Sequence, residues 1–416
     1  MTPPGVGARK GSTLRIALLS MLEPAGSGQP FPRAFLRIAG ASLAQHQLGL
    51  ALALDCQRLI CLARGTSPEL IALQHAAEGA GLRFHIVAGP QQLSALVTAT
   101  DELIVVTEGL FADPAQVGSL LEGTRPVVLA LPDDGAVSDR FERLDINNVA
   151  AGIMRIPGSL VERLHDLPHD VDATSALTRI ALQSGAQMRP VPAEARTGPA
   201  WRMIRSESEA LATETEWLRL RLGRSSAVTL SDRLARVGVL SFGSSLLHGG
   251  NASGASSVGA LAALVVAIAL GCLHLIVPAF VLVALGWVLV RATELLRGAE
   301  RQAYSVMAPA IPRADVLGWV TDLTLIAVCL LGVTETSGMA PIPIGNALFA
   351  PLMLVLMLHL APRLLNDGLA AWTCDRAALA LVLGVAAALG YLDVTVRILA
   401  VALTLAAIVL PPRRIN

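Results

Sequence analysis

The sequence predicts a doubly wound α/β domain followed by an all-α domain of six transmembrane helices. Between about residues 14 and 200, short β-rich runs alternate with helical patterns, which is typical of a parallel sheet with helices on both faces. Beyond about residue 245, the chain is nearly all Ala, Leu, Val, Ile and Gly. We therefore assign a cytoplasmic domain to residues 1–222, a juxtamembrane segment to 223–250 and a transmembrane domain to 251–416.

Several runs in the N-terminal part have the length and the Val, Ile and Leu content of buried strands. They read LRIALLSM, RLICLA, RFHIVAG, ELIVVTEG and PVVLALPD, and segments such as PELIALQHAAEGAG between them have helical periodicity. In a doubly wound sheet, ligands bind beyond the carboxyl ends of the strands. We therefore expect the functional residues of this domain in the loops that follow the strands.

Six apolar runs in the C-terminal part approach the roughly 20 residues that a helix needs to cross a bilayer. They cover 256–273, 276–297, 316–334, 343–361, 371–389 and 392–411. The first two runs form one continuous apolar stretch that is too long for a single span. We place the hairpin between them at His274 and Pro278.

Arginines mark the predicted cytoplasmic side, because positively charged loops are retained there. They flank the connections after the second, fourth and sixth runs: Arg291, Arg297, Arg301, Arg313, Arg363, Arg376, Arg413 and Arg414. The other connections hold only Glu335 and Asp393. This pattern predicts a multi-pass protein of the inner (cytoplasmic) membrane, with both termini and the N-terminal domain in the cytoplasm.

The segment AVTLSDRLARVGVLSF, before the first apolar run, predicts an amphipathic helix on the membrane surface. Leu230, Leu234 and Val237 follow helical spacing, and an aspartate and two arginines stand between them. These arginines are candidates to hold anionic lipid or a substrate phosphate. The alternative is a solvated face beside the membrane.

Charged residues inside apolar runs are functional candidates, because placing a charge in a bilayer is costly. Asp322, about two turns into the third run, is the clearest case. Asp393 and Arg397 stand at helical spacing, so we expect them to pair with each other. Asp375 and Arg376 lie near the end of a run, and we expect their side chains to reach the interface.

Other features argue against alternative classes of protein. The net charge of zero disfavours a nucleic-acid partner, and cysteines without a CxxC pair are expected to be reduced thiols. The apolar LRIALLSML near the N-terminus is short, so we assign it to a strand and not to a signal peptide. Pro168 interrupts any helix that would align His165 and His169 as metal ligands, and we place both histidines in a polar surface loop.

The loop EPAGSGQPFPRAFLRIAGASLAQHQL follows the first strand, and its Gly-x-Gly turn lets backbone amides approach a phosphate. The longer pattern resembles the sugar-phosphate nucleotidyltransferases, a Rossmann-like family whose first loop reads Gly-x-Gly-x-Arg, then Pro-Lys, Leu and Gly-x-Pro-Leu. The matching residues are Gly26, Gly28, Pro32, Leu36, Gly40 and Leu43, with Arg33 in place of the Lys. Pro30 replaces the Arg that contacts the nucleotide phosphates, and Ser42 replaces the later Pro.

The same resemblance implies a metal site and a sugar site, both altered in this chain. The family's metal-binding Asp corresponds to Glu108, a longer carboxylate that could still bind Mg²⁺. NNVAAGIMRIP resembles the substrate-sugar loop at residues 151–153. WRMIRSESEALATE resembles the family's Trp-x-x-Val-Asp-Thr-Pro segment at Trp201, but Arg205 stands in place of the second metal-binding Asp. This cation implies reduced or lost nucleotidyl transfer.

The two parts together resemble the fused inositol-phosphate cytidylyltransferase and CDP-alcohol phosphotransferase. That family carries Asp-x-x-Asp-Gly-x-x-Ala-Arg at the end of its second transmembrane helix and Gly-x-x-x-Asp-x-x-x-Asp in the third. Its four carboxylates bind divalent metal on the CDP diphosphate, and the last is the base for the acceptor hydroxyl. In VRATELLRGAERQ, Glu294 replaces the first Asp, Arg297 replaces the second, and Gly298 is retained. Arg301 serves as the closing Arg only with a shift of one position.

On the third helix, Gly318 and Asp322 match, whereas Ile326 stands in place of the base. The resemblance implies that Glu294 and Asp322 are the catalytic residues and hold one Mg²⁺ if a metal binds, with no other cofactor. Arg297 could instead neutralise a phosphate or pair with one of these carboxylates. The residues assigned to ligand binding are Gly26, Gly28, Arg33, Glu108, Arg297, Gly298 and Arg301.

Two hypotheses about function follow. The one we favour is a pseudoenzyme that binds a nucleotide, a lipid or a partner in phospholipid or polar-lipid headgroup metabolism. The alternative is an active phosphotransferase that releases CMP and joins a CDP-linked alcohol to a lipid or polyol acceptor. Both imply a nucleotide or CDP-alcohol ligand, membrane lipid and a homodimer formed through the membrane domain. A transporter is disfavoured, because the runs show no repeated pattern of Gly/Pro-broken helices.

Overall fold

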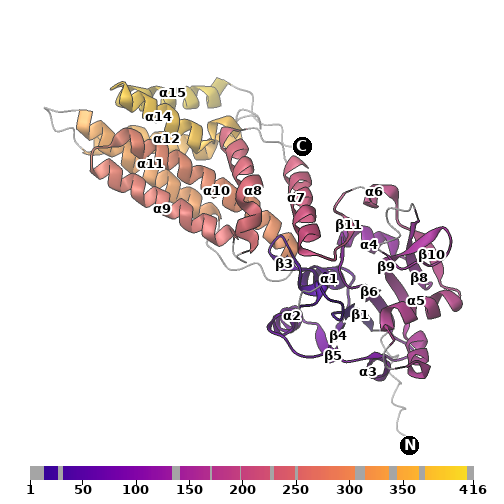
Figure 1. Ribbon diagram of the computed structural model, residues 1–416. Helices are drawn as coiled ribbons and strands as arrows, with labels where there is room; N and C mark the ends of the chain where they lie inside the picture. The colour runs from indigo at the N-terminus through magenta and orange to yellow at the C-terminus, as the bar shows by residue number, and fades with distance from the viewer. Residues whose placement is uncertain are drawn as a thin grey trace, which may run out of the picture. The chain divides into compact units, whose positions relative to one another are not determined.

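The computed structural model describes residues 14–26, 31–133, 141–168, 171–196, 198–224, 229–248, 252–304, 314–336, 344–364 and 371–409. The chain divides into two compact units. One unit contains the chain up to Trp217, and the other contains most of the chain from Leu218 onward. The first is an α/β domain and the second is helical (Figure 1).

A mixed sheet forms the centre of the first unit (Figure 1). Its strands are β1 (Arg15–Ser20), β4 (Arg58–Leu62), β5 (Arg83–Val87), β6 (Glu102–Val106), β8 (Val127–Pro132), β9 (Asn148–Pro157) and β10 (Gln187–Pro190). The order across the sheet is β10-β8-β9-β6-β1-β4-β5. The strands predicted from the sequence are therefore confirmed as β1, β4, β5, β6 and β8.

The prediction of an all-parallel sheet is wrong at β9. This strand runs antiparallel to both β6 and β8, whereas β4, β1 and β6 are parallel to one another. The segment NNVAAGIMRIP was expected to be a loop, but its backbone groups pair with neighbours on both sides. Gly152 within it has a φ of +83°, a conformation that glycine adopts without steric cost.

Helices cover both faces of the sheet, because successive strand residues point to opposite sides. Ala17 and Leu19 of β1 belong to one hydrophobic layer, with α1 (Leu43–Ala53), α2 (Pro68–Gly79) and α4 (Pro114–Leu120). Ile16 and Leu18 belong to the other, with α3 (Pro90–Leu96), the 3₁₀ helix η3 (Gly158–Asp166) and α5 (Ala173–Gln183). The doubly wound arrangement of the helices is thus confirmed.

Among the described residues, six short elements complete this unit, and the longer helix α7 continues from it into the second unit. They are η1 (Arg33–Phe35), β2 (Arg37–Ile38), β3 (Ala41–Ser42), β7 (Leu110–Ala112), α6 (Ala193–Arg196), β11 (Trp201–Met203) and α7 (Glu207–Arg224). β11 pairs with β7, which brings the segment after Trp201 beside the loop that follows β6. The loop predicted around His165 is the helix η3, where that side chain is exposed, and His169 lies outside the described residues.

The second unit is a bundle of long helices (Figure 1). They are α8 (Leu230–His248), α9 (Ala252–Cys272), α10 (Ile276–Tyr304), α11 (Ala314–Thr336), α12 (Ile344–Leu364), α14 (Arg376–Ala388) and α15 (Leu392–Val409). Each predicted apolar run thus contains a helix. The break between α9 and α10 falls at His274, which has a φ of +60°. The predicted hairpin position is therefore confirmed at His274 but not at Pro278, which lies in the first turn of α10.

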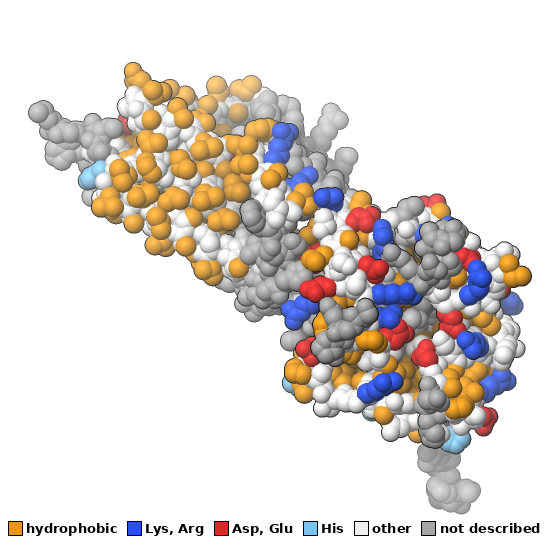
Figure 2. Space-filling model, viewed as in Figure 1, with side chains coloured by type: hydrophobic (Ala, Val, Ile, Leu, Met, Phe, Trp, Pro, Cys, Tyr) orange, Lys and Arg blue, Asp and Glu red, His pale blue; other side chains and the backbone are white. Residues whose placement is uncertain are grey.

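The composition of these helices suits a membrane. Within the described residues, the segments Ala252–Cys272, Ile276–Gly298 and Val316–Thr334 are long and apolar enough to cross a bilayer, and two shorter apolar segments follow in α12 and α14. Figure 2 shows apolar side chains over the face of the helical unit and mixed charges over the α/β unit. Such an apolar outer surface can face the lipid tails of a bilayer.

Helix α8 has two different faces, as the sequence predicted. Ser231, Ala235 and Val239 are buried, and the backbone N–H of Ser231 donates to Asp375 at 3.0 Å. Leu230, Leu234 and Val237 are exposed on another face of the helix. The helix is therefore fixed to the bundle through its small residues and keeps an outward apolar stripe.

Candidate functional site

Glu108 is a buried carboxylate directly after β6 that holds the first loop. Its Oε2 accepts hydrogen bonds from the N–H groups of Leu22 at 2.7 Å and Glu23 at 2.9 Å, and from the hydroxyl of Ser20 at 3.2 Å. Its Oε1 accepts from the N–H of Ala34 at 3.3 Å. Burial raises the pKa of Glu108 above its usual value, although these hydrogen bonds oppose the shift. The carboxylate is thus turned toward the loop.

The Gly-x-Gly turn of the first loop is described only in part. Gly26 is exposed with a φ of +72°, whereas Gly28 lies outside the described residues. Beyond the turn, Arg33 in η1 forms an ion pair with Glu23 from the start of the same loop. The anchoring by Glu108 at Leu22, Glu23 and Ala34 fixes both members of this pair against the end of β6.

A pocket of about 130 Å³ opens beside this loop, at the carboxyl ends of β1 and β6. It is lined by Glu23, Arg33, Val105, Thr107, Val128, Leu129, Phe141, Glu142, Ala150, Gly152, Ile153, Met154, Asp172, Thr174, Ser175, Thr178, Met203 and Arg205. The predicted sugar segment therefore does line a pocket, as part of strand β9. The position agrees with the rule that ligands of doubly wound sheets bind beyond the strand ends.

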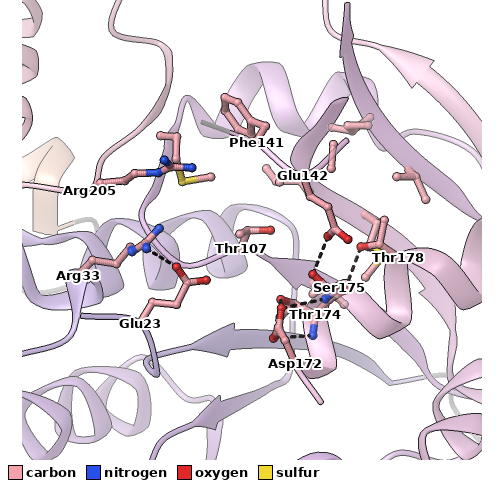
Figure 3. Close-up of a pocket in the computed structure, with 18 residues that line it drawn as sticks. Glu23, Arg33, Thr107, Phe141, Glu142, Asp172, Thr174, Ser175, Thr178 and Arg205 are labelled. Atoms are coloured by element: carbon pink, nitrogen blue, oxygen red, sulfur yellow. Dashed lines mark hydrogen bonds and ion pairs between the residues drawn. The ribbon is translucent and has the colours of Figure 1, made fainter. Parts of the chain in front are cut away.

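One wall of the pocket carries two arginines (Figure 3). Arg33 comes from the first loop and Arg205 from the segment after β11, and both side chains extend toward the same side of the pocket. Gly109 allows this approach, since a Cβ there would lie 2.6 Å from the carbonyl oxygen of Ile204 and 2.7 Å from Cδ of Arg33. The side-chain Nε of Arg33 is buried without a hydrogen-bond partner among the described residues.

The opposite wall carries carboxylates and hydroxyls (Figure 3). Glu142 accepts a hydrogen bond from the hydroxyl of Ser175 at 2.6 Å and forms an ion pair with Arg179 at 3.1 Å. Asp172 caps α5 by accepting from the N–H groups of Thr174 and Ser175, each at 3.2 Å. This wall was not identified from the sequence, because its residues belong to no motif and come from two separate segments.

Trp201 links the C-terminal segment of this unit to the pocket. Its ring is buried, and its Nε1–H donates to the carbonyl oxygen of Ala151 in β9 at 3.0 Å. β11 continues from Trp201 to Met203, and Arg205 follows at the pocket. Trp201 therefore contacts β9, whereas Arg205 lines the same pocket as Arg33 of the first loop.

In the helical unit, the altered motif on α10 forms a surface ion-pair chain. Arg291 pairs with Glu294 one turn later and with Asp232 of α8 at 2.8 Å. Arg297 is half-buried and Gly298 is exposed. Arg301 lies in α10, but its side chain is outside the described residues.

Asp322 of α11 is the centre of a buried polar cluster. Its Oδ1 accepts from Nε of Arg376 at 3.1 Å, and its Oδ2 accepts from Nη2 of Arg376 at 3.3 Å and contacts Nε2 of His359 at 2.8 Å. The guanidinium of Arg376 lies 5.0 Å above the ring of Trp287 on α10. Asp322 and Glu294 therefore have different partners, and the described contacts do not join them.

Asp375 and Arg376 point into the helical unit and not outward. Both side chains are buried, because Arg376 is drawn to Asp322 and Asp375 caps α14 through the N–H groups of Ala377 and Ala378. Asp393 and Arg397 do form the predicted pair, at 3.0 Å. Sequence reasoning missed His359, although a histidine inside an apolar run is itself a signal.

These carboxylates do not fit a Mg²⁺ site. Glu294 is paired with an arginine, and both oxygens of Asp322 accept hydrogen bonds from buried donors. Both oxygens of Glu108 likewise accept hydrogen bonds from the backbone of the first loop. Within the described ranges, no group of three or more His, Cys, Asp or Glu residues is arranged to hold a metal.

Comparisons with known proteins add little to this picture. No family model and no curated protein matches the chain. Among solved structures, the chain is similar to a UDP-glucose pyrophosphorylase from Acinetobacter baumanii, at 10% sequence identity and a TM-score of 0.38. The similarity covers 50% of this chain and 94% of that chain. The function is therefore argued from the pocket's own residues.

Proposed function

We propose that this chain is a multi-pass membrane protein whose α/β unit binds a phosphate-bearing small molecule without transferring a nucleotidyl group. The ligand classes that suit the pocket are a nucleotide and a phosphorylated polyol. The main observation behind the proposal is that Arg33 and Arg205 lie on the same wall of the pocket.

The two walls match the two ends of such a ligand. Guanidinium groups bind phosphate oxygens through charge-assisted hydrogen bonds in a planar, bidentate geometry. Carboxylates and hydroxyls such as Glu142 and Thr178 accept hydrogen bonds from ribose or polyol hydroxyls. A ligand with a phosphate at one end and hydroxyls at the other would satisfy both walls.

The absence of catalysis is proposed from the state of the carboxylates. Metal-assisted nucleotidyl transfer needs acidic ligands, but Arg205 supplies a cation at the pocket and Glu108 faces the first loop. The alternative, a CMP-releasing phosphotransferase in the helical unit, needs a metal on Asp322 and Glu294. Both of these carboxylates are paired with arginines.

In this proposal the helical unit crosses the inner membrane six times and holds the α/β unit on the cytoplasmic side. It serves as a membrane anchor and as a homodimer interface, and the protein senses or recruits a metabolite of polar-lipid headgroup synthesis. Asp322 and Arg376 form a buried ion pair with each other. This pairing supports a structural role for the helical unit and argues against metal-dependent catalysis there.

Binding measured on the full-length protein in detergent tests the proposal. Cytidine monophosphate and inositol monophosphate are the probes, and isothermal titration is the readout. Arg205→Gln and Arg33→Gln should each weaken the binding of the preferred probe by about tenfold or more, the value of one charge-assisted hydrogen bond. Arg202→Gln is the matched control, because Arg202 lies on β11 beside the pocket and pairs with Glu216. Equal weakening by all three variants, or binding of neither probe, would refute the proposal.

The catalytic alternative has its own test. The wild-type protein is supplied with Mg²⁺ and a set of CDP-alcohols, and CMP is measured by chromatography. We expect no release above background. Release that is abolished by Asp322→Asn, while circular dichroism shows that the variant stays folded, would establish the phosphotransferase and overturn the pseudoenzyme proposal.

A further inference from the structure

His359 of α12 has one ring nitrogen fixed inward and the other without a protein partner. Its Nε2 lies 2.8 Å from the buried Oδ2 of Asp322. A carboxylate can only accept, so Nε2 carries the hydrogen, and in the neutral ring Nδ1 is left as an acceptor. Nδ1 makes no hydrogen bond to any described residue, and the side chain is 34% exposed.

The charge behind His359 is balanced. Arg376 pairs with Asp322 through two of its nitrogens, and the two side chains are 10% and 2% exposed. Their charges therefore cancel at a distance, while the carboxylate still polarises the imidazole that donates to it. In the neutral imidazole, Nδ1 is a free hydrogen-bond acceptor.

Trp319 of α11 lies beside this acceptor and is itself 55% exposed. Its ring stacks on His359 with centroids 4.4 Å apart and an interplanar angle of 17°. Stacking fixes the plane of the imidazole, and more than half of the Trp319 side chain stays exposed. An open indole face attracts cations through its quadrupole.

Both residues lie near one end of the bundle. Trp319 is in the second turn of α11, and His359 is in the second turn from the end of α12. At 1.5 Å per residue, each is about 8 Å from its helix end. Trp and His side chains at that depth face the headgroup region of a bilayer if these helices span it.

We propose that Trp319 and His359 form a binding site for the ammonium headgroup of a membrane phospholipid of the ethanolamine type. The ammonium donates a hydrogen bond to Nδ1 of His359 and places its charge against the face of Trp319. A phosphate would bring its oxygens against the lone pair of Nδ1, and a choline group has no N–H to donate. The site is independent of the pocket in the α/β unit.

Native mass spectrometry of the full-length protein in detergent tests this site. The probes are phosphatidylethanolamine, phosphatidylcholine and phosphatidylglycerol with identical acyl chains, titrated separately. We expect the ethanolamine lipid to bind about tenfold more tightly than either of the others, the difference expected of one charge-assisted hydrogen bond.

Variants separate this site from general lipid binding. His359→Phe keeps a ring to stack on Trp319 but removes the acceptor, and Trp319→Leu removes the indole. Each should abolish the preference for phosphatidylethanolamine. Trp372→Leu, at a second exposed tryptophan of the same unit, should leave it unchanged. Equal affinity for the choline lipid, equal affinity for the glycerol lipid, or a preference that survives His359→Phe would each overturn the proposal.

Discussion

Replacing Asp322 by Asn removes the charge that balances Arg376 in the interior of the helical unit. The Asp322 side chain is 2% exposed and that of Arg376 is 10% exposed, so water cannot solvate the guanidinium that remains. Asn keeps one oxygen that can still accept from Nε of Arg376. The variant therefore loses the negative charge that compensates Arg376 but keeps one hydrogen bond to it.

The size of the effect follows from burial. Removing one partner of a buried ion pair costs about 3–5 kcal/mol, whereas exposed pairs contribute about 0–1 kcal/mol. Because Asn retains an acceptor, we expect Asp322→Asn to lower the free energy of unfolding by about 3 kcal/mol. The matched control is Asp393→Asn, whose pair with Arg397 has exposed side chains, and its loss should stay below about 1 kcal/mol.

Reversible unfolding in mixed micelles, followed by circular dichroism, measures both losses. A second variant combines Asp322→Leu with Arg376→Met and removes both charges together. It should recover most of the stability lost in Asp322→Asn, because no unpaired charge remains buried. The reasoning would be refuted if Asp322→Asn cost no more than Asp393→Asn, or if the double variant were less stable than Asp322→Asn.

Two further predictions concern the α/β unit. Burial raises the pKa of Glu108, so its contribution to stability is present below the ordinary carboxyl pKa and is lost as pH rises through the raised one. As pH rises from the ordinary carboxyl pKa through the raised pKa of Glu108, the unfolding free energy of the wild type should therefore fall more steeply than that of Glu108→Gln. Parallel pH profiles of the two proteins would contradict this. Gly109→Ala should cost about 2 kcal/mol or more in thermal unfolding, because its Cβ would lie 2.6 Å from the Ile204 oxygen at a φ of +84°. Gly185→Ala has nearly the same φ, +83°, but open space around the Cβ, and should cost about 1 kcal/mol; equal losses would show that the contact is unimportant.

Local patterns in the sequence were sufficient for most elements. The strands β1, β4 and β6 are short apolar runs, and helices such as α2 have clear periodicity and a serine cap at Ser67. Strand β9 was missed because its segment was assigned to a loop through its resemblance to the substrate-sugar loop of the nucleotidyltransferases. Its place between β6 and β8 is decided by partners 16 to 55 residues away, which no local pattern encodes.

Only the arginine wall and the β9 segment of the candidate site were identified from the sequence, and their contacts were not. Arg33 and Arg205 were identified as departures from a family pattern, and both line the pocket. Glu108 was identified as a ligand-binding carboxylate, but the N–H groups of Leu22, Glu23 and Ala34 converge on it. In the bundle, periodicity can assign Asp322 to a face, yet its partners His359 and Arg376 lie on two other helices.

The central claim is that the arginine wall binds phosphate directly, without metal. Isothermal titration of the full-length protein with cytidine monophosphate and inositol monophosphate, in EDTA and again in Mg²⁺, tests this claim most directly. The account predicts saturable binding of at least one probe with the same dissociation constant in both conditions, weakened about tenfold or more by Arg205→Gln. Binding that requires Mg²⁺, or that is unaffected by Arg205→Gln, would contradict it.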